Sequence, residues 1–296
     1  MARAAIDIGS NTLLLTVQDD AGNILVDEAR VVGLGRGLGD SGSFAKDRME
    51  AADLVLADFA RIAIEHGVQP GEVRAVATSG ARRAMNAQTW LQRVKRHTAL
   101  DVRIISGDEE ARLAWIGARR DLDVGDDTLL VIDLGGGSTE LVLGQGEKIF
   151  GRASLEIGSV RLTEQYLGLG IADSSGLARL RNHVDTQVAT IRLEPGPKTV
   201  IGTAGSVTTL AAMALGLERY DSARVHNSHL DREHLAAFTD KLLPMTPDER
   251  RAWCVVSPER ADYLLAGATI LDRVLLAARL PFMVVSDRGL RFGLLV

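Results

Sequence analysis

Hydrophobic and polar positions alternate along the first thirty residues in a way that predicts a three-stranded meander. Its strands are expected at residues 3–9, 12–18 and 24–32, and Gly22 and Asn23 form a hairpin turn between the last two. Apolar residues then recur at helical spacing. Helices are expected at 46–66, which Gly67 ends, at 87–97, which Asn86 caps, and at 108–120, and strands are expected at 73–77 and 102–105. The first half is therefore a mixed α/β unit that begins with three strands.

The second half predicts a similar order of elements. The expected strands are 128–133, 138–144, 147–157, 198–202 and 282–286, and the expected helices are 174–192, 206–215, 231–243, 247–253, 258–279 and 287–295. The two helices near 231–253 have no counterpart in the first half and are interpreted as an insertion.

Short motifs repeat between the halves in the same order. Ile6-Asp7-Ile8-Gly9-Ser10-Asn11 matches Ile132-Asp133-Leu134-Gly135-Gly136-Gly137, and Thr78-Ser79-Gly80 matches Thr203-Ala204-Gly205 at nearly the same separation. Ile104-Ile105-Ser106 and Val284-Val285-Ser286 form a looser third pair. We interpret the chain as one structural unit used twice. The predicted domains are residues 1–122 and 123–296, with a polar hinge at 121–127 and the last helix able to pack back on the first domain.

Composition narrows the function. Aromatic residues make up 4% of the chain and the formal net charge is −5, which disfavours a nucleic-acid-binding protein with stacking platforms or a basic face. The single cysteine, Cys254, allows no internal disulfide, and no apolar run resembles a signal peptide or a membrane span. We expect a cytoplasmic protein without a nucleic-acid or membrane partner, and the composition leaves a homodimer open.

The sharpest motif is the glycine-rich turn between Asp133 and Glu140. Gly135, Gly136 and Gly137 allow backbone N–H groups to approach a phosphate closely, and the two carboxylates at the ends of the turn suit Mg²⁺ or another divalent cation. The alternative is a glycine-rich hairpin with solvated acids, which is disfavoured because a similar turn follows Asp7.

Three further motifs are each weaker evidence for a phosphate site or a catalytic site when taken alone. Gly205 and Ser206 begin a helix after a strand, where the helix dipole favours an anion. Arg82 follows a strand end and has a guanidinium suited to phosphate, although surface arginines are common. The acids Asp108, Glu109 and Glu110 open a helix, and spacing alone favours their being dipole partners. His226 and His229 match no metal-binding spacing and are interpreted as structural.

Taken together, these motifs resemble the Ppx/GppA family of exopolyphosphatases and guanosine pentaphosphate phosphohydrolases. The runs that carry the resemblance are Ile6–Asn11, Ala77–Ser79 with Arg82, Ile104–Arg112, Ile132–Glu140, Gly202–Gly205 and Gly289–Arg291. They cover essentially the whole chain, and its length resembles the short form of the family, which is expected to lack C-terminal helical domains. The resemblance implies the α/β fold with two actin-like (ribonuclease H-like, ASKHA) domains and an interdomain cleft.

The resemblance also implies roles for single residues. By position Glu110 matches the catalytic base, in contrast to the spacing argument, and Asp133 and Glu140 match metal-binding and water-positioning acids. The phosphate-binding matches are Ser10, Asn11, Gly135, Gly136, Gly137, Ser138, Gly205 and Ser206. The implied reaction is attack of water on the terminal phosphate of inorganic polyphosphate or guanosine pentaphosphate, with Mg²⁺ or another divalent cation.

Three positions depart from the family pattern. Thr12 replaces the usual Ser and keeps its hydroxyl, Leu14 stands where many members carry a basic residue, and Phe292 replaces the usual Glu. Two alternatives remain: a small-molecule kinase of the same superfold, which would need an adenosine pocket, and a catalytically weak sensor that binds polyphosphate or nucleotide, which the departures at Leu14 and Phe292 leave open. Phosphotransfer to or from ADP would identify the kinase.

Overall fold

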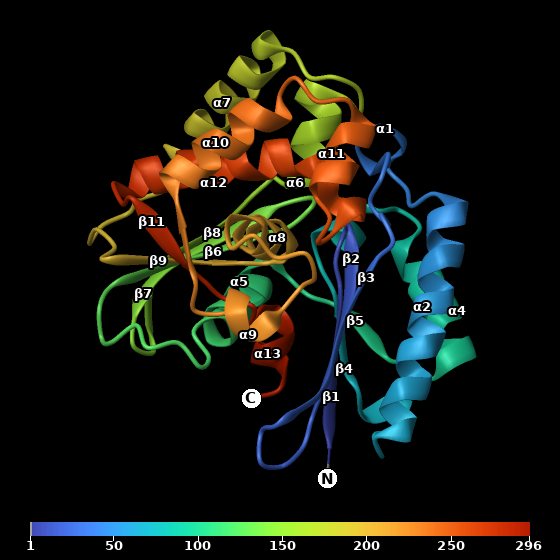
Figure 1. Ribbon diagram of the computed structural model, residues 1–296. Coiled ribbons are helices and arrows are strands. Elements are labelled where there is room, and N and C mark those ends of the chain that lie inside the picture. Colours follow the sequence, from blue (N-terminus) through green and yellow to red (C-terminus); the bar gives the residue numbers. More distant parts are fainter. Residues whose placement is uncertain (1) are drawn as a thin grey trace. The chain divides into compact units, whose positions relative to one another are not determined.

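The computed structural model describes residues 2–296, and contacts divide the chain into two compact units, each with its own β-sheet (Figure 1). Unit 1 runs to Gly117 and also includes Leu290–Val296, and unit 2 is Ala118–Gly289. The predicted actin-like domains, residues 1–122 and 123–296, stay a prediction.

The sheet of unit 1 has the strand order β3-β2-β1-β4-β5. Its strands are β1 (Arg3–Ile8), β2 (Thr12–Gln18), β3 (Ile24–Val31), β4 (Arg74–Ala77) and β5 (Val102–Ile104), and its helices are α1 (Leu38–Ser41), α2 (Lys46–Glu65), η1 (Pro70–Glu72), α3 (Ser79–Arg83), α4 (Ala87–Thr98), α5 (Gly107–Ala118) and α13 (Leu290–Leu294). The first three strands are antiparallel, and β4 and β5 run parallel to β1.

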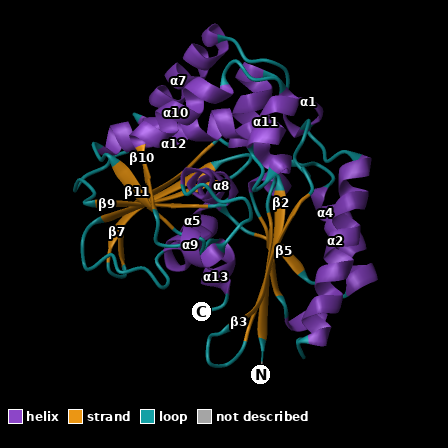
Figure 2. Cartoon of the chain, viewed as in Figure 1, coloured by secondary structure: helices purple, strands orange, loops and turns teal. Residues whose placement is uncertain are grey.

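The two faces of this sheet have separate cores because successive side chains of a strand point to opposite faces. Leu13 and Leu15 of β2 lie in one apolar cluster with Leu56 and Phe59 of α2. A second, smaller cluster joins β1, β4, α5 and α13, and its members are Ala5, Val76, Ile105, Leu113, Leu290, Leu294 and Leu295. Figure 2 shows α2 and α4 together along one side of the unit 1 strands.

Unit 2 has the strand order β10-β11-β9-β6-β7-β8. Its strands are β6 (Leu129–Leu134), β7 (Thr139–Gln145), β8 (Lys148–Leu155), β9 (Thr199–Thr203), β10 (His229–Asp231) and β11 (Phe282–Val285). Its helices are α6 (Ser159–Leu162), η2 (Thr163–Leu167), α7 (Ser174–Val188), α8 (Gly205–Ala214), α9 (Ser222–Val225), α10 (Arg232–Leu242), α11 (Pro247–Trp253), η3 (Pro258–Tyr263) and α12 (Leu264–Ala278). The helix α12 packs against both α7 and α10, as Figure 1 shows.

The repeat predicted from the sequence is visible in the turns. The Gly9 N–H donates to the Thr12 carbonyl at 3.0 Å, and at the corresponding place the Gly135 N–H donates to the Ser138 carbonyl at 3.0 Å. Strand register extends the match, because Asp7 lies opposite Leu14 and Asp133 lies opposite Glu140. The two sheets share one order of five strands, to which β10 adds an edge in unit 2.

The structure also corrects details of the predicted elements. The helix expected at 258–279 is a 3₁₀ turn, η3, followed by α12, and the last helix begins at Leu290. It begins late because the Ser286 hydroxyl accepts the Arg288 N–H and holds that segment in a turn. Asn86 does not cap α4 with its side chain, since its amide instead bonds both backbone groups of Phe44. The short elements α1, η1, α3, α6, η2, α9 and β10 were not predicted.

Candidate active site

The turn after β1 is held by backbone hydrogen bonds from the loop that follows β3. The Gly35 N–H donates to the Ser10 carbonyl at 2.6 Å, and the N–H groups of Val32 and Gly33 donate to the Asn11 carbonyl at 2.9 Å. A Cβ on Gly80 would lie 2.8 Å from the Ser10 Oγ, so the hydroxyl packs against the start of α3. The turn that carries Ser10 and Asn11 is therefore fixed beside the carboxyl end of β4.

Arg82 and Glu110 form a largely buried ion pair in unit 1. Arg82 Nη1 donates to Glu110 Oε2 at 2.5 Å and to the Ile105 carbonyl at 3.0 Å. Glu110 retains only 6% of its exposure, whereas the Arg82 side chain retains 24%. The Ile105 carbonyl fixes the guanidinium, and the guanidinium fixes the carboxylate. A phosphate bound to Arg82 would thus lie next to the Glu110 carboxylate.

The neighbouring acid, Glu109, has a different environment. Both of its oxygens accept hydrogen bonds from Arg103 of β5, at 2.9 and 2.6 Å. These hydrogen bonds hold the pKa of the Glu109 carboxyl below its ordinary value. Its backbone N–H donates to the Ser106 hydroxyl, which caps α5. Glu109 is therefore the acid that matches the dipole-partner reading of the sequence, and Glu110 is the buried one.

In unit 2 the glycine-rich turn is anchored through its carbonyl groups. The Gly135 carbonyl accepts the Ser159 N–H, and the Gly136 carbonyl accepts the N–H groups of Val160 and Arg161, all at 3.0 Å. Arg161 Nε donates to the Gly137 carbonyl at 2.8 Å. Within residues 2–296 the backbone N–H groups of Gly136, Gly137 and Ser138 donate to no backbone carbonyl. The turn thus has the donors that a phosphate-binding loop offers.

Gly158 explains how the turn stays close to α6. A Cβ at this position would lie 2.2 Å from the Gly136 carbonyl oxygen and 2.4 Å from the Gly137 carbonyl carbon. Only a residue without a side chain allows this approach.

The two predicted metal acids lie side by side. Asp133 and Glu140 are direct partners across the β6–β7 ladder, which places both side chains on one face of the sheet. Glu140 is 2% exposed, and its Oε1 accepts hydrogen bonds from Ser138 at 2.9 Å and Ser154 at 2.7 Å. Within residues 2–296 no three His, Cys, Asp or Glu side chains gather as a metal cage. The pair still fits Mg²⁺, which commonly takes one or two carboxylates and fills its octahedron with water and phosphate oxygens.

Gly205 and Ser206 begin α8, as predicted, and connect to the glycine-rich turn. The Ser206 hydroxyl donates to Ser159 Oγ at 3.3 Å, and Ser159 in turn bonds Gly135. A Cβ on Gly205 would lie 2.9 Å from Cζ of Arg260, so this guanidinium lies across the start of α8. Arg260 Nε is buried without a hydrogen bond among the described residues. The sequence pattern predicted that Arg260 lies within a regular helix and did not indicate its contact with the start of α8.

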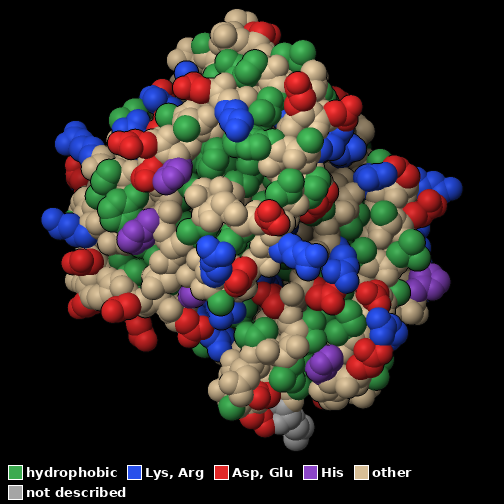
Figure 3. Space-filling view, viewed as in Figure 1, with side chains coloured by type: hydrophobic (Ala, Val, Ile, Leu, Met, Phe, Trp, Pro, Cys, Tyr) green, Lys and Arg blue, Asp and Glu red, His purple; other side chains and the backbone are tan. Residues whose placement is uncertain are grey.

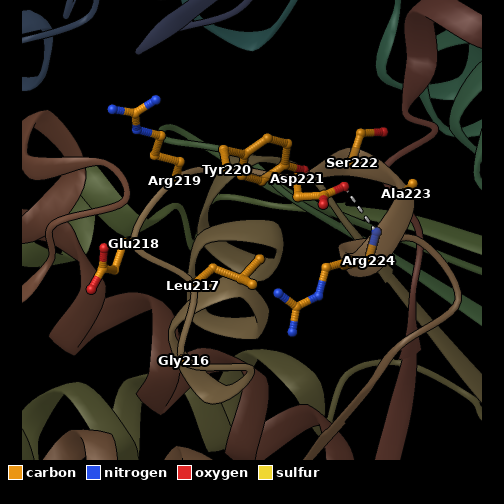
Figure 4. Close-up of a pocket in the computed structure, with 9 residues that line it drawn as sticks. All are labelled: Gly216, Leu217, Glu218, Arg219, Tyr220, Asp221, Ser222, Ala223 and Arg224. Carbon is orange, nitrogen blue, oxygen red and sulfur yellow. Dashed lines mark hydrogen bonds between the residues drawn. The ribbon is translucent and has the colours of Figure 1, made fainter.

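Unit 2 has further polar features to which the sequence analysis gave no functional role. A surface pocket between α8 and α9 is lined by one continuous segment, Gly216–Arg224, in which Asp221 accepts the Arg224 N–H (Figure 4). From the same segment the Tyr220 hydroxyl donates to Asp287 at 2.5 Å. His226 accepts the Asp287 N–H at Nδ1, and burial lowers the pKa of its imidazole. Acidic and basic side chains are interspersed on the face shown in Figure 3.

The predicted residues thus form two groups. Unit 1 brings together the Ser10–Asn11 turn, Arg82 and Glu110, and unit 2 brings together the following: Asp133, Gly135, Gly136, Gly137, Ser138, Glu140, Gly205 and Ser206. Sequence reasoning missed the residues that hold the second group in place: Ser154, Gly158, Ser159, Arg161 and Arg260. The Gly158-Ser159 pair after a strand was the one local signal that could have found them.

Comparison with known proteins identifies the family. The family model of the Ppx/GppA phosphatase family matches residues 15–296. The chain belongs to this family. Exopolyphosphatase 2 of Mycobacterium tuberculosis is 33% identical over 287 residues, which covers 92% of this chain and 89% of that protein.

Solved structures extend the match to the fold. An exopolyphosphatase-like protein has a TM-score of 0.92 at 32% identity, covering 100% of this chain and 98% of its own. The Aquifex aeolicus Ppx/GppA family member has a TM-score of 0.82 at 32% identity, covering 100% and 96%. The predicted α/β, actin-like fold is confirmed. No helix within residues 2–296 has the length and apolarity that crossing a membrane requires.

Proposed function

We propose that the protein is a hydrolase that releases terminal phosphate from inorganic polyphosphate, guanosine pentaphosphate or both. Family membership and the exopolyphosphatases among its relatives support a phosphatase that acts on phosphoric anhydrides. The observation that carries the proposal is the Arg82–Glu110 pair, because it sets a buried carboxylate directly beside a fixed guanidinium, a group suited to binding phosphate.

In the proposed reaction, Glu110 orients a water molecule and takes its proton while the water attacks the terminal phosphorus in line. Arg82 donates to an oxygen of the phosphoryl group under attack, and charge-assisted bonds of this kind are stronger than neutral ones. The N–H groups of Gly136, Gly137 and Ser138 bind oxygens of the phosphate chain. The leaving chain departs with one phosphate fewer.

Asp133 and Glu140 are proposed to hold the divalent cation. Such a cation neutralises negative charge on phosphoryl oxygens when it is bound. The chain's own contribution is orientation: Ser138 and Ser154 fix Oε1 of Glu140, and the β6–β7 ladder sets Asp133 next to it.

The test compares Glu110→Gln with the matched neighbour Glu109→Gln in a phosphate-release assay on polyphosphate and on guanosine pentaphosphate, with and without Mg²⁺. Removing the base should lower kcat by about 10²–10⁴-fold while substrate binding persists. Glu109→Gln removes only a surface pair with Arg103 and should keep kcat within about twofold. Equal activity of Glu110→Gln and wild type would refute the assigned base. A wild-type protein that binds polyphosphate without releasing phosphate would be a sensor.

A further inference from the structure

The C-terminal helix α13 docks on α5, the helix that carries Glu110. Leu290, Leu294 and Leu295 share a buried cluster with Leu113 of α5 and with the sheet residues Ala5 and Val76. At the centre of this contact the backbones nearly touch, since a Cβ on Gly293 would lie 2.2 Å from the Leu113 carbonyl oxygen. Leu113 lies three residues after Glu110, which is almost one helical turn.

Hydrogen bonds from Arg291 also hold α13 to the sheet of unit 1, at β2 and at β3. Arg291, which is 8% exposed, makes paired hydrogen bonds to Asp27 of β3, both at 2.9 Å, and a third to Thr16 of β2 at 2.8 Å. The Thr16 hydroxyl donates to the same Asp27 carboxylate at 2.9 Å.

The end of the segment is held as well. The Leu295 backbone oxygen accepts a hydrogen bond from Arg3 at 2.9 Å, and the oxygens of Leu294 and Val296 accept from Arg74. The segment 290–296 therefore has fixed contacts at its start, its middle and its end.

We propose that Gly293 and the Arg291–Asp27 pair are positioning residues for the proposed general base. They set the height of α5 above the sheet, and that height sets the distance from the Glu110 carboxylate to Arg82 and to the attacking water. Arg82 is also held by the Ile105 carbonyl, which lies before α5 and whose own N–H donates to the Ala77 carbonyl of β4 at 3.1 Å, so a shift of α5 changes the geometry of the pair. The proposal rests on the proposed function, because it assigns these residues to the work of Glu110.

The structure gives the size of the perturbation. Gly293→Ala places a methyl group 2.2 Å from a carbonyl oxygen, whereas such atoms are rarely closer than about 3.2 Å. The helices must separate by roughly 1 Å, and a misplacement of that size is enough to cost about 10²-fold in rate. We expect kcat to fall about 10²-fold with KM within about threefold of wild type, since the substrate-binding groups are untouched.

The decisive experiment is a double-variant cycle in the phosphate-release assay. If Gly293 acts through Glu110, then Glu110→Gln with Gly293→Ala is no slower than Glu110→Gln alone, because the base is already lost. Multiplying effects would overturn the proposal, as would wild-type kcat in Gly293→Ala. Gly71→Ala is the matched control, because no atom lies within 4 Å of its added Cβ.

A measurement other than activity keeps the test independent of the phosphate-release assay. Hydrogen exchange of peptides covering 107–118 should quicken in Gly293→Ala and in Arg291→Met, with little change over 46–65. Unchanged exchange in α5 would overturn the proposal even if kcat fell. A wild-type protein without phosphatase activity refutes the proposed function, whereas an inactive Glu110→Gln beside a fully active Gly293→Ala refutes only the positioning role.

Discussion

The substitution Leu14→Arg tests what the departure at this position does to substrate binding. Leu14 lies on β2 directly opposite Asp7, two residues after the turn that carries Ser10 and Asn11. Its neighbours Leu13 and Leu15 are fully buried against α2, whereas Leu14 points to the other face and is half-buried. Leu14 therefore does not share the packing of Leu13 and Leu15 against α2.

The expected gain in binding follows from one added charge near this turn. A charge-assisted hydrogen bond to a phosphate contributes about 1.5–3 kcal/mol, which corresponds to about 10- to 150-fold tighter binding of polyphosphate. Losing a half-buried leucine costs about 1 kcal/mol, so Tm should fall by only a few degrees. The gain should shrink as salt rises, because free ions screen an exposed charge.

The assay measures the Kd for long polyphosphate and for a short nucleotide at two salt concentrations, with Tm on the same samples. Leu54→Arg is the matched control, since it makes the same change on α2 at a side chain that is 76% exposed. Leu54→Arg should leave both Kd values near wild type. A large fall in Tm for Leu14→Arg without tighter polyphosphate binding would refute the reasoning, as would an equal gain in the Leu54→Arg control.

Other predictions concern the proposed metal site, a histidine and the cysteine. Asp133→Asn and Glu140→Gln should raise the Mg²⁺ concentration needed for half-maximal phosphate release, since an amide is a poor ligand for a hard cation, and an unchanged Mg²⁺ titration in both would refute a metal role. Burial and the nearby Arg288 lower the pKa of His226, so the unfolded chain binds more protons as pH falls through about 6.5 and stability should decline there. His226→Gln should flatten this decline in urea unfolding measured between pH 8 and pH 5.5, and an identical slope would contradict it. Burial raises the pKa of Cys254 to about 11, so a thiol reagent at pH 8 should label it only as the protein unfolds, and prompt labelling of the native protein would contradict this.

The fold was largely predictable because its signals are local and occur twice. Alternation gave the strands of both meanders to within about two residues, and the glycine turns after Asp7 and Asp133 gave the repeat. The observed register agrees with the same pattern, since a slip of one residue would turn Leu13 and Leu15 away from their core. The short helices and β10 escaped prediction because tertiary contacts, and not periodicity, stabilise them.

The candidate site was less predictable because many of its geometric determinants lie far apart in the sequence. The residues that could touch phosphate stand in short motifs, whereas the groups that hold them come from elsewhere. Gly158 is recognisable as essential only when the Gly136 carbonyl is seen 2.2 Å from its absent Cβ. Arg260 reaches the start of α8 from a turn more than fifty residues later, a contact that periodicity does not encode.

The acids at the start of α5 show most clearly where sequence reasoning stops. Consecutive residues of a helix differ by about 100° in direction, so Glu109 and Glu110 necessarily face different surroundings. Which of them is buried depends on the rotation and height of α5. Arg103 on β5 holds Glu109 at the surface, and the close contact of Leu113 with Gly293 determines which face of the helix is buried. The identity of the buried acid is thus decided by residues in β5 and α13, one six positions before Glu109 and the other almost two hundred positions after it.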